Sequence, residues 1–403
     1  MENSIENNPL PSVDWEMDED LGRGAVLVER LEAQRAKSWG AVSRRGLEVF
    51  SYDKAAQILR SRDFYTPFGK LSDNSGLVPE DGWTYFHMER MLAGVKGPEH
   101  VKLKSIFLDF FGPRAVEKWR PHVADIVDRL SREQEGEESF DLAKVCLKLP
   151  AFLFCRLINK PDKDAEFLVK TSDEILKIFE QNPANRDVIL QSGNALKQYT
   201  DALLRERKED RGDDLISFLI GKQESGLLTD EELTHNVAML LEASVDNTGN
   251  QFALTMMHLL SEPARWDRLV ADPSRTVPSI NESIRITPKV STINRITARD
   301  TQIDGHEISA GTWVSISVIA AHRDKAGMPD ADVFDQGRST ARAPLVFGGG
   351  MHLCLGMLLS MLELEEGIAT LARKYPRMRL SGEPHWTLTS RNITVESMPV
   401  TVN

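Results

Sequence analysis

The sequence predicts a mainly α-helical fold with a smaller β region. Three observations support this prediction: apolar residues recur at helical spacing over most of the chain after Pro98, strand-like alternation is confined to short segments, and no internal repeat or low-complexity linker interrupts the 403 residues. With 41% hydrophobic and 27% charged residues, the composition is that of an ordinary globular protein. We therefore expect one domain over residues 21–403, preceded by an acidic tail over residues 1–20.

Before Pro98 the expected elements are mixed. Residues 21–39 have the pattern of a helix, residues 40–52 have strand character, and a second helix begins at Lys54. Residues 61–97 contain scattered glycines, prolines and aromatic side chains, so we expect an irregular segment there. A long loop within a compact domain usually has a function.

After Pro98 the apolar periodicity predicts a series of helices, over residues 99–111, 114–132, 139–157, 163–180, 187–208, 213–220, 230–261, 263–272, 276–286 and 355–374. The segment 230–261 is apolar nearly all round, which is typical of a helix in the core of a large domain. Strands cluster late, as a hairpin over 301–308, a strand over 312–318 and a second hairpin over 386–402.

The charge and the cysteine content exclude several classes of protein. A net charge of −12 argues against a nucleic-acid partner, which would need a basic face. No apolar run is long enough to span a membrane and the N-terminus is unlike a signal peptide, so we expect a cytoplasmic protein without a membrane partner. Cys146 and Cys155 lie in an apolar run and are expected to be reduced core thiols. Without Cys-x-x-Cys spacing, a zinc site is not expected.

The third cysteine, Cys354, lies in the glycine-rich stretch 347–356, just before an apolar helical run. Glycines let the backbone approach a flat ligand closely, and a helix N-terminus favours a thiolate. A dry pocket, with Phe347 packed near a cysteine that has no partner cysteine, suits a bond from sulfur to iron. Taken alone, an isolated cysteine in this setting could equally be a buried, unreactive thiol.

The stretch resembles the haem-binding loop of the cytochrome P450 family, whose pattern is Phe-x-x-Gly-x-x-x-Cys-x-Gly. Phe347, Gly350, Cys354 and Gly356 match it in register. The resemblance implies the triangular-prism fold of that family, with haem b between a long central helix and the helix after the cysteine loop. It also implies Cys354 as the iron ligand, with Phe347, Gly348 and Gly356 beside the cofactor.

The resemblance further implies cations or donors for the haem carboxylates. By position, these are His352, Arg295 and His100, with Lys104 one turn after His100. The family usually has arginine where Lys104 stands, and lysine keeps the charge but loses the forked geometry. Each of these residues, taken alone, could be an ordinary exposed cation.

A buried Glu-Arg-Arg network is also implied. Glu282 and Arg285 are three residues apart in a helical stretch and so share a face, and Arg338 would be the third member. Such a network needs every partner, because a lone buried charge is costly. A solvated surface ion pair is the alternative explanation of Glu282 and Arg285.

The oxygen-activating motif of the family, Ala-Gly-x-Asp/Glu-Thr at a helix bulge, is altered in this chain. Asp246 matches the acid, Asn247 stands at the threonine position, Thr248 follows it, and Ser244 replaces the glycine. An amide donates a hydrogen bond but cannot relay a proton as a hydroxyl does. Three possibilities stay open for these candidate catalytic residues: Asn247 orients a water, a polar group of the substrate helps, or Thr248 shifts into place.

By resemblance, the protein is a soluble bacterial monooxygenase that inserts one oxygen atom from O2 into a C–H bond. The irregular segment before Pro98 would cover the substrate pocket. The wall of the pocket is expected to include the following residues, which suit a small-to-medium, largely apolar molecule: Leu240, Ala243, Val290, Thr292 and Ile393.

Electrons would come from NAD(P)H through a separate reductase and a ferredoxin or flavodoxin. An acidic partner would need a basic face near the cysteine loop, for which the candidates are Lys102, Lys104, Arg114, Lys118, Arg373 and Lys374. Two alternatives remain: a peroxide-driven peroxygenase, which retention of Asp246 disfavours, and a haem-binding sensor or carrier without turnover, to which Asn247 gives some support.

Overall fold

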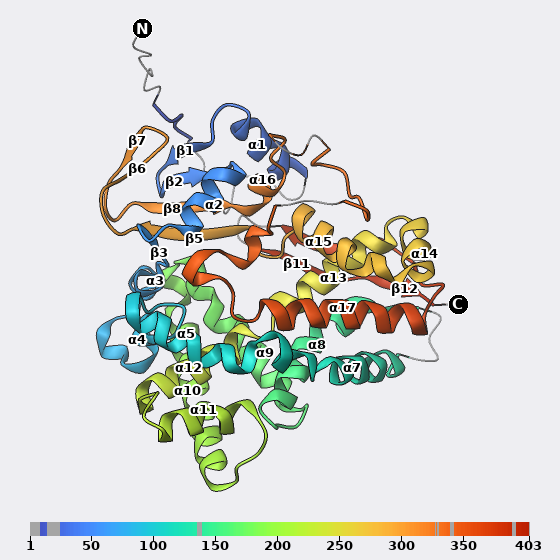
Figure 1. Cartoon of the computed structure of the whole chain (residues 1–403), viewed down its shortest axis with the longest axis horizontal. Helices are drawn as coiled ribbons and strands as arrows, with labels where there is room; N and C mark the ends of the chain where they lie inside the picture. The colour runs from blue at the N-terminus through green and yellow to red at the C-terminus, as the bar shows by residue number, and fades with distance from the viewer. Residues whose placement is uncertain are drawn as a thin grey trace.

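The structure is a computed structural model of the chain. It describes residues 9–13, 25–134, 139–326, 328, 330–338, 342–388 and 392–402. Helices make up most of the molecule and a β region covers one end of it, with α1, α2 and α16 beside the main sheet (Figure 1). The predicted class, mainly α with a smaller β part, is confirmed.

The main sheet joins the N-terminal segment to residues far along the chain. Its five strands have the order β1-β2-β8-β5-β3, with bounds Gly40–Ser43, Gly46–Val49, Trp313–Ser317, Thr292–Thr297 and Phe64–Tyr65. β1 and β2 form an antiparallel hairpin, β2 pairs parallel with β8, and β8 pairs antiparallel with β5. The remaining strands form small sheets: β4 Phe140–Asp141, β6 Thr301–Ile303, β7 His306–Ile308, β9 Arg379–Leu380, β10 His385–Leu388, β11 Ile393–Ser397 and β12 Pro399–Thr401.

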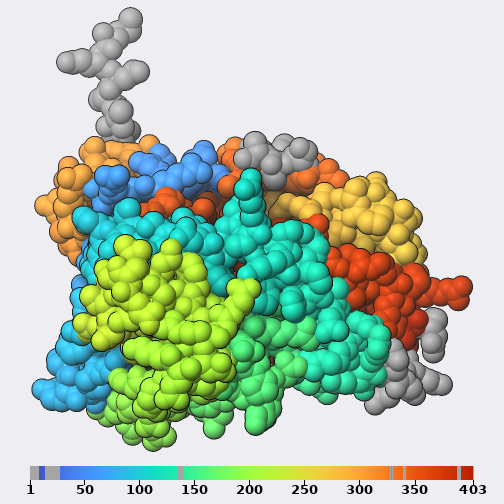
Figure 2. All heavy atoms as spheres, turned by 60° about the horizontal axis from the view of Figure 1, so that its bottom comes forward, coloured from blue at the N-terminus to red at the C-terminus, as the bar shows by residue number. Residues whose placement is uncertain are grey.

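The helices of the N-terminal part and of the sheet end are short: α1 Ala25–Arg35, α2 Tyr52–Arg60, α3 Phe68–Asn74, α4 Trp83–Arg90 and α16 Val318–His322. The remaining helices form the larger helical part: α5 Gly97–Phe111, α6 Pro113–Glu117, α7 Arg120–Arg132, α8 Leu142–Leu157, α9 Asp164–Leu176, α10 Arg186–Glu209, α11 Leu215–Glu224, α12 Asp230–Ala243, α13 Asn247–Leu260, α14 Pro263–Ala271, α15 Thr276–Ile286 and α17 Met357–Lys374. Seen from the helical end, α10 and α11 cover much of the surface (Figure 2). None of the helices in the described ranges has the length and apolar character that a bilayer crossing requires.

Helix α13 is at the centre of the core, packed against α8, α15 and α17. The approach to α8 is close at Gly249, where an added Cβ would lie only 2.9 Å from the Cα of Leu147. On the other side, an added Cβ at Gly367 of α17 would lie 2.8 Å from the ring of Phe252. The small residues at these crossings fix α13, and with it the start of that helix at Asn247.

Two predicted helices are interrupted in the structure. The segment 230–261 is not one helix, because it breaks at residues 244–246 between α12 and α13. The segment 114–132 divides into α6 and α7, where Pro121 in the first turn of α7 lacks an N–H and suits a new helix start.

Other predictions of secondary structure are wrong, mainly where strands pair with residues far along the chain. The segment 61–97 is not irregular throughout, since it contains β3, α3 and α4. Strand β5 was not predicted. The expected C-terminal hairpin is divided, because β10 pairs with β11 whereas β12 pairs with β4 and β9. Most of the expected N-terminal tail, residues 1–20, lies outside the described residues, but Ser12 pairs with Val42 of β1 and Val13 is buried.

The Glu282, Arg285 and Arg338 side chains form one buried ion-pair network. Arg285 Nε and one terminal nitrogen each lie 2.8 Å from an oxygen of Glu282, and Arg338 Nε lies 2.9 Å from Glu282 Oε1. Burial alone would raise the pKa of Glu282, but the hydrogen bonds from Arg285, from the Asp335 N–H and from Arg338 outweigh it and lower the pKa. Arg285 also donates to the carbonyls of Ala331 and Val333, so the network ties α15 to the 330–338 loop.

Replacing Arg285 with leucine should destabilise the protein by about 3–5 kcal/mol, because Glu282 would keep a buried charge without its main partner. The matched control is Arg275→Leu, which breaks the exposed pair with Asp272 at the same spacing and should cost less than about 1 kcal/mol. Urea unfolding of both variants measures the difference in the free energy of unfolding. Equal effects of the two substitutions would contradict the structural role of the network.

The network also makes the stability of the protein depend on pH. Folding lowers the pKa of Glu282, so the stabilisation by its carboxylate is complete above the pKa of the unfolded state. This stabilisation is lost as the pH falls through the lower pKa of the folded state.

Candidate active site

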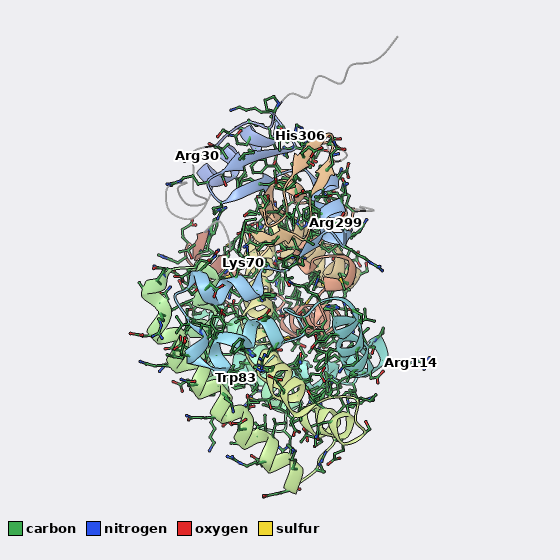
Figure 3. The ribbon with its side chains drawn as sticks, turned by 90° about the vertical axis from the view of Figure 1, so that its left-hand side faces the viewer. Arg30, Lys70, Trp83, Arg114, Arg299 and His306 are labelled. Atoms are coloured by element: carbon green, nitrogen blue, oxygen red, sulfur yellow. The ribbon has the colours of Figure 1, made fainter. Side chains whose placement is uncertain are left out.

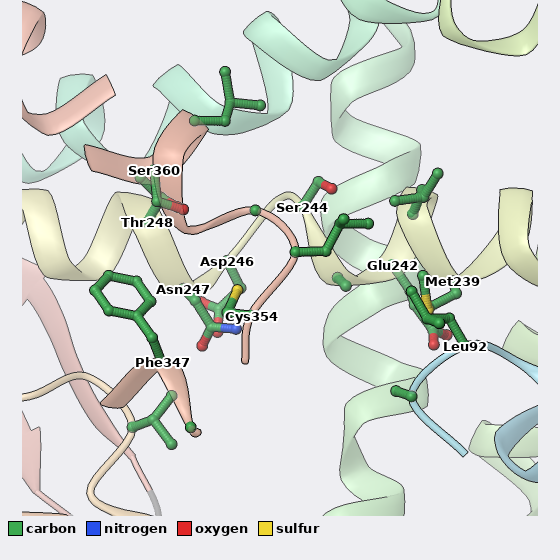
Figure 4. A pocket seen from close by; sticks show the side chains of 18 of the residues that line it. Leu92, Met239, Glu242, Ser244, Asp246, Asn247, Thr248, Phe347, Cys354 and Ser360 are labelled. Carbon is green, nitrogen blue, oxygen red and sulfur yellow. The ribbon is translucent and has the colours of Figure 1, made fainter. Parts of the chain in front are cut away.

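A cavity of about 470 Å³ lies between the α12–α13 break and the loop that precedes α17. Its wall is mostly apolar, and its polar side chains include His352 from the loop. Cys354 from the loop and Asp246 and Asn247 from the break also line it (Figure 4). Ala243, Asn247 and Cys354 count as exposed although they lie inside the molecule, because they face this cavity.

The cysteine loop is shaped by its glycines. Gly348 and Gly350 have φ values of +74° and +59°, in the region that favours glycine. A Cβ at Gly350 would also lie 3.1 Å from the backbone of Arg60, so the loop packs directly on α2. The N–H of Cys354 donates to the carbonyl of Phe347 at 2.8 Å, which closes the loop and directs the sulfur toward the cavity.

The environment of Cys354 has two opposite effects on the pKa of its thiol. Burial raises its pKa, while the N–H groups of Gly356 and Met357 and the ammonium of Lys104 act in the opposite sense without cancelling the effect of burial. The helix-terminus effect expected from the sequence is therefore present but smaller than desolvation. Coordination to a metal ion would displace the proton, since a coordinating thiol is deprotonated.

Part of the cavity wall gathers Arg295, Lys104 and two histidines, with no acid paired to Arg295 among the described residues. Arg295 is 4% exposed and donates to the carbonyl of Asn294, and no carboxylate of the described residues pairs with it. Burial lowers the pKa of Arg295 to about 10. Burial, followed by the charges of Arg295, His100 and Lys104, lowers the pKa of His352 to about 3.

His100 completes this group. Its ring meets that of His352 edge to face at 4.6 Å, and its Nδ1 is buried without a hydrogen-bond partner. Burial and the charge of Lys104 lower the pKa of His100. Lys104 itself donates to the carbonyls of Met351 and Leu353, so it holds the cysteine loop. A buried cluster of this kind is costly unless an anion joins it.

The break between α12 and α13 places three polar residues on the cavity wall. Asp246 Oδ2 lies 3.1 Å from Lys289 Nζ, and Asp246 Oδ1 accepts a hydrogen bond from Asn250 at 2.6 Å. Asn247 faces the cavity, whereas the hydroxyl of Thr248 lies 2.8 Å from that of Ser360 on α17 (Figure 4).

The structure brings most of the predicted site residues to one cavity. Its wall includes Asp246, Asn247, Thr248, His100, Lys104, Arg295, Phe347, Gly348, His352, Cys354, Gly356, Leu240, Ala243 and Val290. Two predicted pocket residues, Thr292 and Ile393, are buried and do not belong to the wall as formed by the described residues.

The wall also contains charged residues that were not predicted as site residues. Lys289 follows a proline in a short loop, a setting typical of surface lysines, so the sequence gave no signal for it. Glu242 gave no local signal either, because its partner His87 is far away in the sequence. Glu363 looked like one of several acids on the α17 surface, yet it is buried and lines the cavity.

Cys354 lines a buried cavity together with the polar residues of the α12–α13 break and with Arg295, which has no carboxylate partner among the described residues. Such a cavity has the chemical features of a site for an acidic cofactor. Comparisons with known proteins give the family. The profile described as cytochrome P450 matches residues 81–378. Luteothin monooxygenase of Streptomyces thioluteus is 31% identical over 356 residues, which is 87% of each chain. Nocardicin C N-oxygenase of Nocardia uniformis subsp. tsuyamanensis is 31% identical over 75% of this chain and 77% of that protein.

Solved structures of other proteins show the same fold. A myxobacterial cytochrome P450 in complex with myristic acid has a TM-score of 0.84 at 26% identity, over 94% of this chain and 96% of that chain. An epothilone D-bound cytochrome P450 has a TM-score of 0.87 at 21% identity, over 97% of this chain and 100% of that chain. The chain belongs to the cytochrome P450 family, and it is an oxidoreductase of the monooxygenase type.

The family implies a haem cofactor, and the cavity fits one. The sulfur of Cys354 faces open space, the wall is mostly apolar, and the cationic cluster around Arg295 has no carboxylate partner among the described residues. These are the chemical requirements of an iron porphyrin with acidic side chains.

We expect Arg295→Leu to lower the haem content of the purified protein and to speed haem transfer to apomyoglobin at least tenfold, because a buried cation would no longer pair with the haem carboxylates. The control is Arg299→Leu, four residues further on, where the side chain is exposed and pairs with Asp63 at the sheet end (Figure 3). Equal transfer rates for the two variants would show that Arg295 does not bind the cofactor.

Proposed function

We propose that this chain is a haem-thiolate monooxygenase that holds haem b and inserts one oxygen atom from O2 into a C–H bond of a small-to-medium, largely apolar molecule. The observation that carries the proposal is that Cys354, from the loop before α17, lines the same cavity as Asp246 and Asn247 at the break between α12 and α13. A thiolate-ligated haem, when bound, supplies the activation of O2 and the cleavage of its O–O bond. We further propose that residues 21–403 act as one domain.

In this proposal Cys354 is the iron ligand, and Arg295, His352 and His100 donate to the haem carboxylates. Phe347, Gly348 and Gly356 border the cofactor and exclude water from the sulfur. Lys104 replaces the arginine that is usual in the family, and it contacts the cysteine loop. Its ammonium holds the carbonyls of the cysteine loop and adds positive charge near the sulfur.

The contacts at the helix break favour one route for protons. The Thr248 hydroxyl is paired with Ser360, whereas the Asn247 amide and the Ser244 hydroxyl line the cavity without a hydrogen bond to another described residue. Of these two donors, Asn247 stands at the threonine position of the family motif. An amide orients a water or a polar group of the substrate but does not carry the proton itself. Asp246, held in place by Lys289 and Asn250, is then the group that exchanges the proton.

Electrons would reach the site from NAD(P)H through a reductase and a ferredoxin or flavodoxin. The basic residues proposed for docking are not all available: Lys102 pairs with Glu232, Arg373 with Glu366, and Lys374 with Asp128. Arg114 and Lys118 are exposed, and Arg114 projects from the helical part (Figure 3). We therefore propose the face around these two residues for the acidic partner. We also propose a cytoplasmic location, because NAD(P)H and its reductases are found there.

The first test is the CO difference spectrum of the dithionite-reduced protein. A strongly red-shifted Soret band is expected from thiolate-ligated iron, and it should be lost in Cys354→His, where imidazole replaces the thiolate. A band typical of imidazole ligation in the unchanged protein, or a variant with an unchanged band, would sink the assignment of Cys354. Turnover with peroxide but not with NAD(P)H and ferredoxin would favour a peroxygenase, and gas binding without NAD(P)H consumption would favour a sensor or carrier.

Asn247→Ala should lower the amount of product formed per NAD(P)H consumed several-fold and should change substrate affinity little, because the donor that orients water would be lost. Thr248→Ala is the matched control: its hydroxyl is engaged by Ser360, so its loss should affect coupling less. The measurement is the ratio of product to NAD(P)H with a fixed redox partner. Unchanged coupling in Asn247→Ala would exclude a role in proton delivery.

A further inference from the structure

Lys104 is a cation of the cavity wall that binds backbone instead of an acid. Its ammonium, on α5, donates to the carbonyl of Met351 at 2.5 Å and to the carbonyl of Leu353 at 2.9 Å. No carboxylate of the described residues pairs with it. Lys102, two residues earlier on the same helix, pairs with Glu232 of α12. The charge of Lys104 is therefore uncompensated, whereas that of Lys102 is not.

The two carbonyls hold the Lys104 ammonium close to the sulfur of Cys354. Leu353 directly precedes Cys354, whose N–H donates to the carbonyl of Phe347 at 2.8 Å and fixes the loop on its other side. Lys104 is half-buried, so water screens its charge less than that of an exposed lysine. Burial raises the pKa of the Cys354 thiol, and the Lys104 ammonium acts against this effect. The charge of Lys104 thus reaches the sulfur.

The contacts of Lys104 distinguish it from Arg295. Arg295 donates to the carbonyl of Asn294, and a guanidinium has further N–H groups in a planar fork that suits a carboxylate. Lys104 has three N–H donors, and two of them are engaged by the cysteine loop. An ammonium is a compact point charge, so it needs no forked partner to exert its effect. We therefore expect Lys104 to act on the sulfur and Arg295 to act on an anion in the cavity.

We propose that Lys104 sets the reduction potential of the haem held by Cys354, by placing a fixed positive charge beside the cysteine loop. The proposal rests on the haem-thiolate function proposed above. Reduction by one electron adds one negative charge beside a thiolate, and a partly buried cation stabilises that charge and raises the potential. The electron comes from the ferredoxin or flavodoxin of the proposed function, and Lys104 keeps its protons throughout.

The test is the midpoint potential of the haem-loaded enzyme, measured by anaerobic potentiometric titration of its absorption spectrum. Lys104→Gln keeps a hydrogen-bond donor and loses the charge. The ratio of ferrous to ferric protein at a fixed potential should fall about tenfold in this variant, a shift of about 59 mV to lower potential for one electron. Lys104→Met, which loses the donors as well, should show a fall at least as large. Lys104→Arg keeps the charge and should restore most of the shift.

Lys102→Gln is the matched control, because Lys102 is an exposed lysine of the same helix that already pairs with Glu232. Its potential should equal that of the unchanged protein. An unchanged potential in both Lys104→Gln and Lys104→Met, or an equal fall in Lys102→Gln, would overturn the proposal.

Haem transfer to apomyoglobin separates the proposed role from that of a carboxylate ligand. Lys104→Gln should release haem more slowly than Arg295→Leu, and equal rates would make Lys104 a ligand of the haem carboxylates instead. The CO spectrum distinguishes failure of this proposal from failure of the monooxygenase proposal. A red-shifted band together with unchanged potentials would refute only the role of Lys104, whereas absence of that band from the unchanged protein would refute both proposals.

Discussion

The break between α12 and α13 is the constraint on which the rest of the site depends. A continuous apolar helix through residues 244–246 would leave no open backbone and no room beside the cysteine loop. Because α13 is fixed by its close packing on α8 at Gly249, its first residue is fixed as well. The break therefore turns Ala243 and Asn247 toward the cavity and brings Asp246 to Lys289.

Part of the cavity wall is polar, although an apolar wall would give a more stable protein. Arg295 is a buried cation without an acid among the described residues, and His100 and His352 are held neutral beside it. Such a cluster lowers the stability of the protein until an anion joins it. Binding of an acidic cofactor then stabilises the folded state by mass action, so the same residues link folding to cofactor loading.

The structural features that could be predicted from the sequence are those whose residues lie close together along the chain. The cysteine loop and the pair Glu282 and Arg285 lie within a few residues, and their spacing alone indicated their arrangement. The resemblance placed a helix bulge near Asp246, but the apolar residues on all sides of the segment 230–261 predicted one continuous helix instead of a break at 244–246. Strand β5 pairs with segments far along the chain, and the contact of Glu242 with His87 spans distant helices, so no periodicity could indicate either of them.

The charged groups of the cavity wall lie in different places, and this separation would orient a bound molecule. Positive groups gather around Arg295 beside the cysteine loop, where they suit acidic groups of a cofactor. Asp246, at the break between α12 and α13, is held by Lys289 and Asn250. The acidic groups of a bound cofactor would therefore be drawn toward Arg295 and away from Asp246 by the same field.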